Sequence, residues 1–262
     1  MPILDLITAL FVLVDDRLKR NTVPDHSQQK LTPSELITLG MLYALKGVSQ
    51  SQIYRWLTAN YRFLFPNLPE RTRLFRRLAA RQDWTDFFLA QIGLLGVGDS
   101  FGVELIHPRR QGRAKDSQAK KGLSNHRWIV GVKISVLVNP LGRIVDWRWD
   151  GANVHDSAFR EMFSSHPETI SYVDSGFHKK EGDPELMRIC RRGECNFRFL
   201  VETVFSLFVG FMNLKKIRER RLWNIQAHLG FALAAFNVVQ EILGGEPDEA
   251  GRAPLRMAPI CL

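Results

Sequence analysis

Three acidic residues, Asp99, Asp174 and Glu202, each adjoin an apolar segment of the sequence. Asp99 follows LLGVG (94–98) and Asp174 follows ISYV (170–173), so each is expected to end a short buried strand. Glu202 lies in LVETVF (200–205), within a stretch so apolar that it predicts a helix buried nearly all round. Because a buried carboxylate without a partner is strongly destabilising, Glu202 is expected to face a cation.

The two aspartates share one local setting, since a serine, Ser100 or Ser175, follows each of them. If the two strands are parallel neighbours, both carboxylates emerge at one edge of the sheet, where functional groups of α/β proteins gather. Taken singly, each aspartate also has an ordinary structural explanation as a strand-end or turn residue. Three converging carboxylates without His or Cys ligands suit Mg²⁺ or Mn²⁺. Two such ions, about 4 Å apart, promote phosphoryl transfer, so the three acids are predicted to hold two ions.

Arg198 precedes Glu202 by four residues, which places it one helical turn back on the same face. Three roles fit this position equally well. The guanidinium can hold a DNA phosphate, orient the glutamate, or form a plain ion pair with it.

Four short blocks accompany the acids: VGVK (130–133), ANVHD (152–156), YVDSGF (172–177) and RFLVETVFS (198–206). In this order and context, the chain resembles bacterial insertion-sequence transposases of the Asp-Asp-Glu type, in the insertion-sequence 4/5 superfamily. The resemblance covers essentially the whole chain, with weaker motifs in the first third.

The resemblance implies a ribonuclease H-like catalytic core, in which a mixed sheet is flanked by helices. It also implies a two-metal enzyme that cleaves the ends of its element and transfers the 3′-hydroxyl strand into target DNA. Asp99, Asp174 and Glu202 take the places of the first, second and third acid. The implied partner is double-stranded DNA, bound by a homodimer or a larger assembly, in the bacterial cytoplasm with the nucleoid.

The family pattern around the last acid is Tyr, two residues, Arg, three residues, Glu, six residues, Lys. Arg198 and Glu202 match this pattern, whereas Cys195 and Val209 stand where the Tyr and the Lys would be. Both positions usually help to bind the transposon end, so that task is open here. Three basic residues expected further along the same helix are available as substitutes: Lys215, Lys216 and Arg218.

The first third of the chain is predicted to be helical. Thr32, Pro33 and Glu35 form a capping-box pattern that opens one helix. Gly47 is expected to end it, and Ser49 to begin the next. A third helix, ERTRLFRRLAAR (70–81), carries three arginines, Arg73, Arg77 and Arg81, on the side opposite its apolar face. This order is typical of a helix-turn-helix DNA reader, although a solvated arginine face on a plain helical bundle has the same pattern.

From about residue 93 the pattern changes to that of an α/β layer fold. WIVGVKISVLV (128–138) and RIVDWRWD (143–150) predict an antiparallel hairpin around the turn at Asn139–Gly142. A helix is expected over 155–164, and a final helix over 223–243. We therefore expect a helical DNA-binding domain at 1–92 and a catalytic domain at 93–262.

The charge balance favours a polyanionic partner. Lys and Arg number 36 and Asp and Glu 27, which gives a formal net charge of +9. Two segments concentrate these charges, one after the first acid and one after the third. The residues predicted to contact DNA there are Arg109, Arg110, Arg113, Lys115, Lys120, Lys121, Lys133, Lys215, Lys216 and Arg218. Either segment is also compatible with an ordinary solvated surface.

Other classes of protein are less well supported. Three cysteines argue against a disulfide framework, and the spacing of Cys190, Cys195 and His178 matches no standard zinc pattern. No membrane span is predicted, because the best candidate, Pro2–Val14, is too short and carries Asp5. Two alternatives share part of the evidence: a host ribonuclease H-like nuclease, and a DNA-binding regulator whose second domain is an inactive scaffold.

Overall fold

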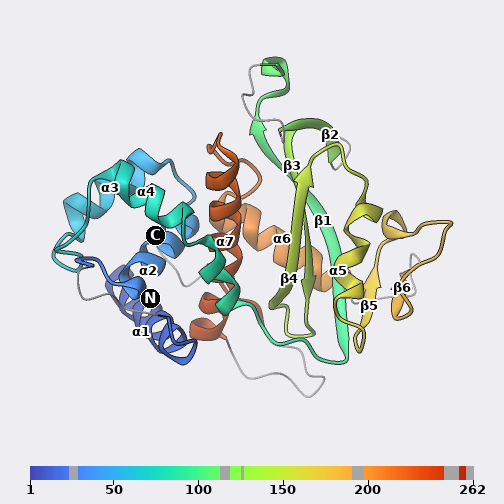
Figure 1. The fold of residues 1–262 in the computed structure, drawn as a ribbon, viewed down its shortest axis with the longest axis horizontal. Helices are drawn as coiled ribbons and strands as arrows, with labels where there is room; N and C mark the ends of the chain where they lie inside the picture. Colours follow the sequence, from blue (N-terminus) through green and yellow to red (C-terminus); the bar gives the residue numbers. More distant parts are fainter. Residues whose placement is uncertain (24–28, 113–118, 125–126, 191–197, 245–253, 258–262) are drawn as a thin grey trace.

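The computed structural model describes residues 1–23, 29–112, 119–124, 127–190, 198–244 and 254–257. A helical region and a sheet region lie side by side, with α6 and α7 between the sheet and the N-terminal helices (Figure 1). The N-terminal elements are α1 (Ile3–Arg20), α2 (Pro33–Lys46), α3 (Gln50–Asn60), α4 (Arg71–Ala79) and the 3-10 helix η1 (Gln82–Phe88). The sheet region is an α/β structure with a mixed sheet.

The strands are β1 (Leu95–Ile106), β2 (Lys120–Ser124), β3 (Arg127–Val138), β4 (Ile144–Gly151), β5 (Ile170–Val173) and β6 (Met187–Ile189). β1 pairs antiparallel with β3 on one side and parallel with β5 on the other, and β6 continues the sheet parallel to β5. On the edge away from β1, β3 pairs with two strands. Its first half pairs with β2, and its second half pairs with β4. The predicted hairpin is thus confirmed as β3 and β4.

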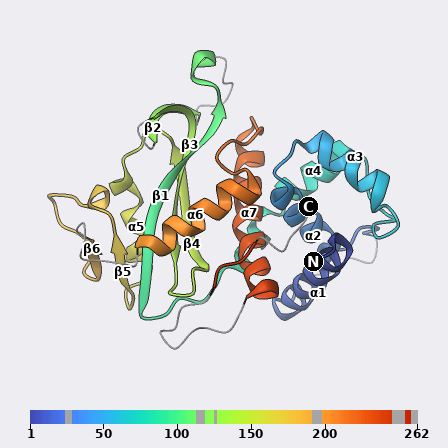
Figure 2. The ribbon, with the colours of Figure 1, turned by 180° about the vertical axis from the view of Figure 1, so that it is seen from behind.

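Helical elements cover both sides of this sheet. Between the strands and after them lie η2 (Pro108–Arg110), η3 (Asp156–Arg160), α5 (Glu161–Ser164), η4 (Ser175–Phe177), α6 (Arg198–Met212) and α7 (Leu222–Leu243). The helix expected over 155–164 is mostly 3-10, with one α-helical turn at its end. Figure 2, seen from behind, shows α6 crossing one face of the sheet, with α5 on the other.

The N-terminal helices begin where local capping chemistry places them. Thr32 caps α2 through a capping box in which its hydroxyl accepts from the backbone N–H of Glu35, as expected. Gly47 ends α2 in the left-handed region, with φ 57°, and Ser49 caps α3 through a second capping box with Gln52. Glu70 caps α4 by accepting from the first N–H groups of that helix.

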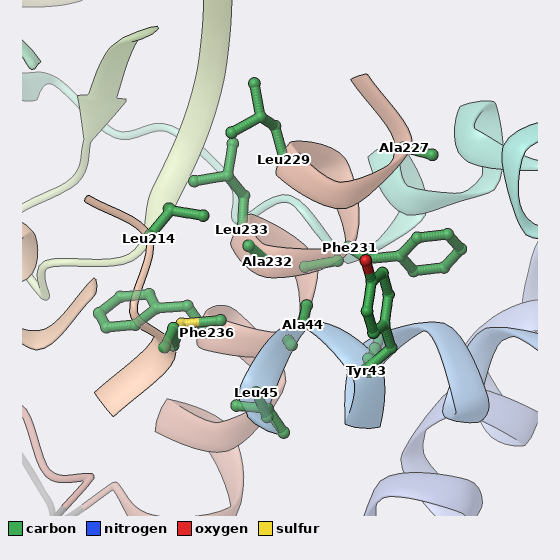
Figure 3. Packing of buried hydrophobic residues seen from close by; sticks show 14 of the residues in the cluster. Tyr43, Ala44, Leu45, Leu214, Ala227, Leu229, Phe231, Ala232, Leu233 and Phe236 are labelled. Atoms are coloured by element: carbon green, nitrogen blue, oxygen red, sulfur yellow. The ribbon is translucent and has the colours of Figure 1, made fainter. Parts of the chain in front are cut away.

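α7 is the central helix of the apolar core. It packs against α1, α2, α4 and η1 on one side, and against β4 on the other. Figure 3 shows the aromatic and aliphatic side chains of α7, among them Phe231 and Phe236, meeting Tyr43, Ala44 and Leu45 of α2. α2 and α7 approach closely at Gly40, where a Cβ would lie 2.4 Å from the Phe231 ring. By packing, α7 therefore lies with the N-terminal helices, although its residues belong to the 93–262 part of the chain.

α7 is also the one helix of the described residues that is long and apolar enough to cross a membrane, judged by length and composition. Most of it is enclosed, since 78% of its most apolar window is buried inside the protein. A mostly buried core helix passes the same test, and α7 packs as a core helix against α1, α2, α4 and η1. Pro2–Val14, the best candidate in the sequence, lies largely in α1, which buries Leu6, Leu10 and Val14.

Candidate active site

Asp99 and Asp174 are neighbours across the parallel pair of strands. The last register pair of β1 with β5 is Gly98 with Val173, so the next residue of each strand is an aspartate. Asp174 ends β5, as expected. Asp99 does not end its strand, because β1 continues to Ile106 and pairs with β3 at Asp99–Val136. The long antiparallel pairing with β3 extends β1 beyond the point where the apolar segment stops.

Alternation along β1 assigns the face on which Asp99 lies. Phe101, two residues later, packs against α6 through Phe205, with ring centroids 4.6 Å apart. Asp99 therefore lies on the sheet face that α6 covers, and α6 carries Glu202. The intervening Ser100 lies on the opposite face.

Glu202 is exposed, with 58% of its side chain accessible, so the expectation that it is buried was wrong. α6 buries only one stripe against the core, made of Val201, Val204, Phe208 and Met212. Its outer side carries exposed apolar residues, including Phe199, Val209 and Phe211. The helix is apolar all round in sequence but is covered on one side only.

Arg198 joins two of the three acids. Its guanidinium nitrogen lies 3.3 Å from Asp174 Oδ2 and 3.9 Å from Glu202 Oε1. The side chain is one-third exposed, and its Nε is buried without a hydrogen-bond partner among the described groups. Arg198 is thus the cation that faces Glu202 in this structure, and it also faces Asp174.

Of the three acids, Asp99 is the most buried. The pKa of the Asp99 carboxyl is raised to about 6, chiefly by loss of solvation and to a smaller extent by the negative charges of Asp174 and Asp156. The backbone N–H of Ser100 and the charge of Arg198 oppose this rise. The cation requirement first assigned to Glu202 therefore belongs to Asp99, the acid that is most poorly solvated.

Asp156, on the far face of the sheet, is a fourth acid of this region that was not among the predicted site residues. Its Oδ1 accepts hydrogen bonds from Ser100 Oγ at 2.5 Å and from Lys133 Nζ at 2.9 Å. Gly176 lies so close that a Cβ there would be 3.0 Å from Asp156 Oδ2. Asp156 therefore ties β1, β3 and the turn after Asp174 together. In the sequence, Asp156 ends the ANVHD block and directly follows His155.

The donor set has the chemistry of a site for a hard divalent cation, since all three acids supply carboxylate oxygens. Within the described residues, no three His, Cys, Asp or Glu side chains lie close enough together to hold one ion as they stand. The raised pKa of Asp99 marks a carboxylate that a cation would stabilise, and the Arg198 contacts show that positive charge is accepted between Asp174 and Glu202. The chemistry of these residues therefore fits Mg²⁺ or Mn²⁺.

The basic residues predicted after the first acid have different surroundings. Arg109, Arg110, Lys120 and Lys121 are exposed on η2 and β2. Lys133 is 12% exposed and is paired with Asp156. Arg113 and Lys115 lie outside the described residues.

The basic residues after the third acid follow α6 rather than belong to it, because α6 ends at Met212. The segment after it runs beside β1, with backbone hydrogen bonds that join Lys215 and Ile217 to Glu104. The buried Glu104 carboxylate pairs with Lys216 at 2.7 Å and with Arg127. Burial lowers the pKa of Lys215. Arg218 donates to Gln52 of α3 at 3.3 Å.

The three arginines predicted on one face of α4 also differ. Arg73 is exposed, whereas Arg77 is half-buried and donates to the carbonyl of Leu31 at 3.1 Å. Arg81 lies over the Trp84 ring at 4.9 Å, just after α4 ends. Of these three side chains, only Arg73 is exposed and without such a contact.

Comparison of the chain with protein-family models, with curated proteins and with solved structures gave no match. The site nevertheless has a defined chemistry. Two neighbouring aspartates, a glutamate on the helix over them and an arginine that bridges two of the acids are groups of the kind that bind divalent cations and phosphate.

Proposed function

We propose that this protein is a metal-dependent DNA transposase with a ribonuclease H-like catalytic core. The observation that carries the proposal is the pairing of Asp99 and Asp174 at the parallel β1–β5 junction, on the face where α6 presents Glu202. The three acids come from distant parts of the sequence: Asp99 and Asp174 follow neighbouring positions of β1 and β5, and Arg198 links Asp174 to Glu202. A structural role for any one of them does not require the other two.

The sheet supports the same proposal. Its order is β4-β3-β1-β5-β6, and β2 pairs with the same edge of β3 as β4 does. β1, β3 and β4 are mutually antiparallel neighbours, and β5 and β6 follow parallel to β1. This order and these directions support the proposed ribonuclease H-like core. A helix that follows the last strand and lies over β1 is where such a core places its third acid.

Asp99, Asp174 and Glu202 are the residues that would hold the two Mg²⁺ or Mn²⁺ ions. When bound, the ions supply a more reactive attacking oxygen and a stabilised leaving oxygen. Arg198 neutralises Asp174 and Glu202 in their absence, which prevents mutual repulsion of the acids. Because its side chain is partly exposed, Arg198 can also turn toward a DNA phosphate.

Double-stranded DNA is the proposed partner, and the formal charge of +9 supports it. Each chain carries one set of acids, whereas an insertion element has two ends. A homodimer or a larger assembly on DNA is therefore part of the proposal, in the bacterial cytoplasm at the nucleoid. The exposed residues Arg73, Arg109, Arg110, Lys120 and Lys121 are proposed backbone contacts.

The test is a strand-transfer assay with a plasmid that carries the inverted repeats flanking the gene. A transposase nicks at the repeat boundary in Mg²⁺ and joins the released 3′ end to a second DNA. Cleavage without regard to the repeats would identify a host nuclease instead. Binding of the repeats without any cleavage in Mg²⁺ or Mn²⁺ would identify a regulator.

A further inference from the structure

Five arginines line a groove that lies away from the acids. The groove has a volume of about 440 Å³ and is formed where α3 and α4 meet the segment between α6 and α7. Arg71 and Arg76 come from α4, and Arg218, Arg220 and Arg221 come from that segment. We call this the arginine groove. Residues far apart in the sequence thus combine into one basic surface.

The charge of the arginine groove is largely uncompensated. None of the five guanidiniums forms an ion pair with an acid within the part of the chain that the structure describes. Arg71 donates to the Ser51 hydroxyl at 2.8 Å, and Arg218 to the Gln52 amide oxygen at 3.3 Å, both of which are neutral acceptors. Clustered like charges without partners destabilise a fold unless an anion binds them.

One carboxylate, that of Glu219, does line the groove, but it is directed to the interior. The residue is 5% exposed. Its Oε1 accepts a hydrogen bond from the Tyr43 hydroxyl and lies 3.5 Å from His228 Nδ1. Glu219 therefore anchors the segment to α2 and α7 and leaves the arginine heads beside it without a counter-ion.

The start of α3 adds further anion-binding groups. Ser49 caps this helix, and Gln50 and Ser51 of its first turn line the groove. The first N–H groups of a helix have no partner inside the helix, and they carry the positive end of its dipole. Arginine and helix N-termini are both well suited to phosphate oxygens.

We propose that the arginine groove binds the phosphate backbone of duplex DNA, at a fixed distance from the bond that is cut. This inference rests on the proposed function for the identity of the DNA. Arg220 donates to the carbonyl of Leu105, which lies six residues beyond Asp99 on β1. At about 3.4 Å per residue, the groove is roughly 20 Å from Asp99 along the strand. For a straight duplex along β1, that is roughly six base pairs.

The first test measures DNA binding by the full chain. The double variant Arg71→Gln, Arg76→Gln is compared with a matched control of equal charge loss, Arg62→Gln, Arg188→Gln, whose side chains are exposed outside the groove. Fluorescence anisotropy with an element-end duplex is recorded at several salt concentrations. Groove substitution is expected to weaken binding about tenfold or more and to reduce the salt slope by roughly two, whereas the control changes affinity about twofold. Equal losses in both variants would overturn the proposal, and so would tighter binding of duplex RNA than of duplex DNA.

The second test measures distance. DNA affinity is measured for wild type and for the groove variant with two duplexes. One extends four base pairs from the cut site toward the groove, and the other extends twelve. Only the longer duplex is expected to show the effect of the groove variant. An equal effect on both lengths would overturn the proposed position.

These outcomes are separable from failure of the proposed function. If the acid variants still cleave DNA while the groove variant loses binding, the catalytic assignment fails and the groove stands. If the acid variants lose cleavage while the groove variant binds DNA normally, the catalytic assignment stands and the groove proposal fails. The groove double variant and the control double variant should both melt at the wild-type temperature, which confirms that their folding is intact.

Discussion

The carboxyl group of Asp99, with a pKa of about 6 in the metal-free protein, links folding stability to pH. The ordinary pKa of an aspartate is 3.8, so between about pH 4 and 6 the folded state binds a proton that the unfolded state has released. Stability is therefore lost as pH rises through this window and is constant above it. The substitution Asp99→Asn removes this contribution of the carboxyl group to the pH dependence of stability.

We expect Asp99→Asn to be more stable than wild type at pH 7.5 in EDTA, by about 1 to 3 kcal/mol. At pH 4 the two proteins should have nearly the same free energy of unfolding, since the wild-type carboxyl is then protonated. Urea unfolding at both pH values measures this difference. An equal difference at both values would mean that Asp99 is not the group responsible.

Bound divalent cations should restore the folding stability that is lost when the buried Asp99 carboxyl ionises. Ligand carboxylates must be deprotonated to bind metal, so metal binding and proton loss are coupled. We expect Mg²⁺ to raise the wild-type melting temperature more at pH 7.5 than at pH 5, and to raise that of Asp99→Asn much less. Glu168→Gln, an exposed acid outside the site, is the control and should behave as wild type. A pH-independent Mg²⁺ effect would contradict the assignment.

At the residue scale, the sequence predicted some positions well and others poorly. The adjacency of Asp99 and Asp174 was predictable because each follows a buried apolar segment, and parallel strands bring such ends together. The role of Asp156 was not, because its partners Ser100 and Lys133 are distant in sequence. A hydrogen-bond network between strands leaves no periodic pattern in the chain.

At the scale of elements, α6 shows where pattern reasoning fails. Hydrophobic periodicity indicates the face that packs when the other face is polar. Here both faces are apolar, and Phe199, Val209 and Phe211 cannot be distinguished by type from the buried Val201, Val204 and Phe208. Only the tertiary arrangement shows which side the core covers.

A pair of lysine substitutions on α6 tests this assignment. Val209→Lys, on the exposed side, should change the free energy of unfolding by less than about 0.5 kcal/mol. Val204→Lys, fully buried, should destabilise by more than about 3 kcal/mol, because an unpaired charge enters the core. Chemical unfolding of both variants gives the comparison. Similar stabilities would mean that α6 is oriented differently.

The contact of α2 with α7 predicts an unusual glycine substitution. Gly40→Ala should destabilise by about 1 to 3 kcal/mol despite the better helix propensity of alanine, because its Cβ would collide with the Phe231 ring. Gly210→Ala in α6 has open space around its Cβ and should stabilise by about 0.5 to 1 kcal/mol. Opposite signs in guanidinium unfolding are expected. A stabilised Gly40→Ala variant would contradict the close approach of the two helices.

At the scale of the whole molecule, one apolar core runs from the N-terminal helices through α7 to the sheet. The change from helices to strands near residue 92 was visible in the sequence, since the hydrophobic period changes there from helical to alternating. The return of α7 to the N-terminal helices was not visible. An apolar helix indicates that it is buried, but not which distant segment buries it.

Truncation tests this shared core. Residues 93–262 alone would expose the side of α7 that normally contacts α1, α2 and α4. We expect this fragment to aggregate, or to lack a cooperative thermal transition, while the full chain melts in one transition. A sharp melt and a dispersed NMR spectrum from the fragment would show that the sheet region folds independently.

The central claim is that Asp99, Asp174 and Glu202 form one metal-dependent active site on DNA. The most direct measurement is the single-turnover rate of cleavage of an element-end duplex in Mg²⁺, for wild type, Asp99→Asn, Asp174→Asn, Glu202→Gln and the control Glu168→Gln. We expect each of the three acid variants to lose at least about 100-fold in rate, equivalent to about 2.7 kcal/mol, with DNA affinity retained, and the control to cleave normally. Cleavage at the wild-type rate by any one of the three would remove that residue from the site, and cleavage by all three would contradict the account.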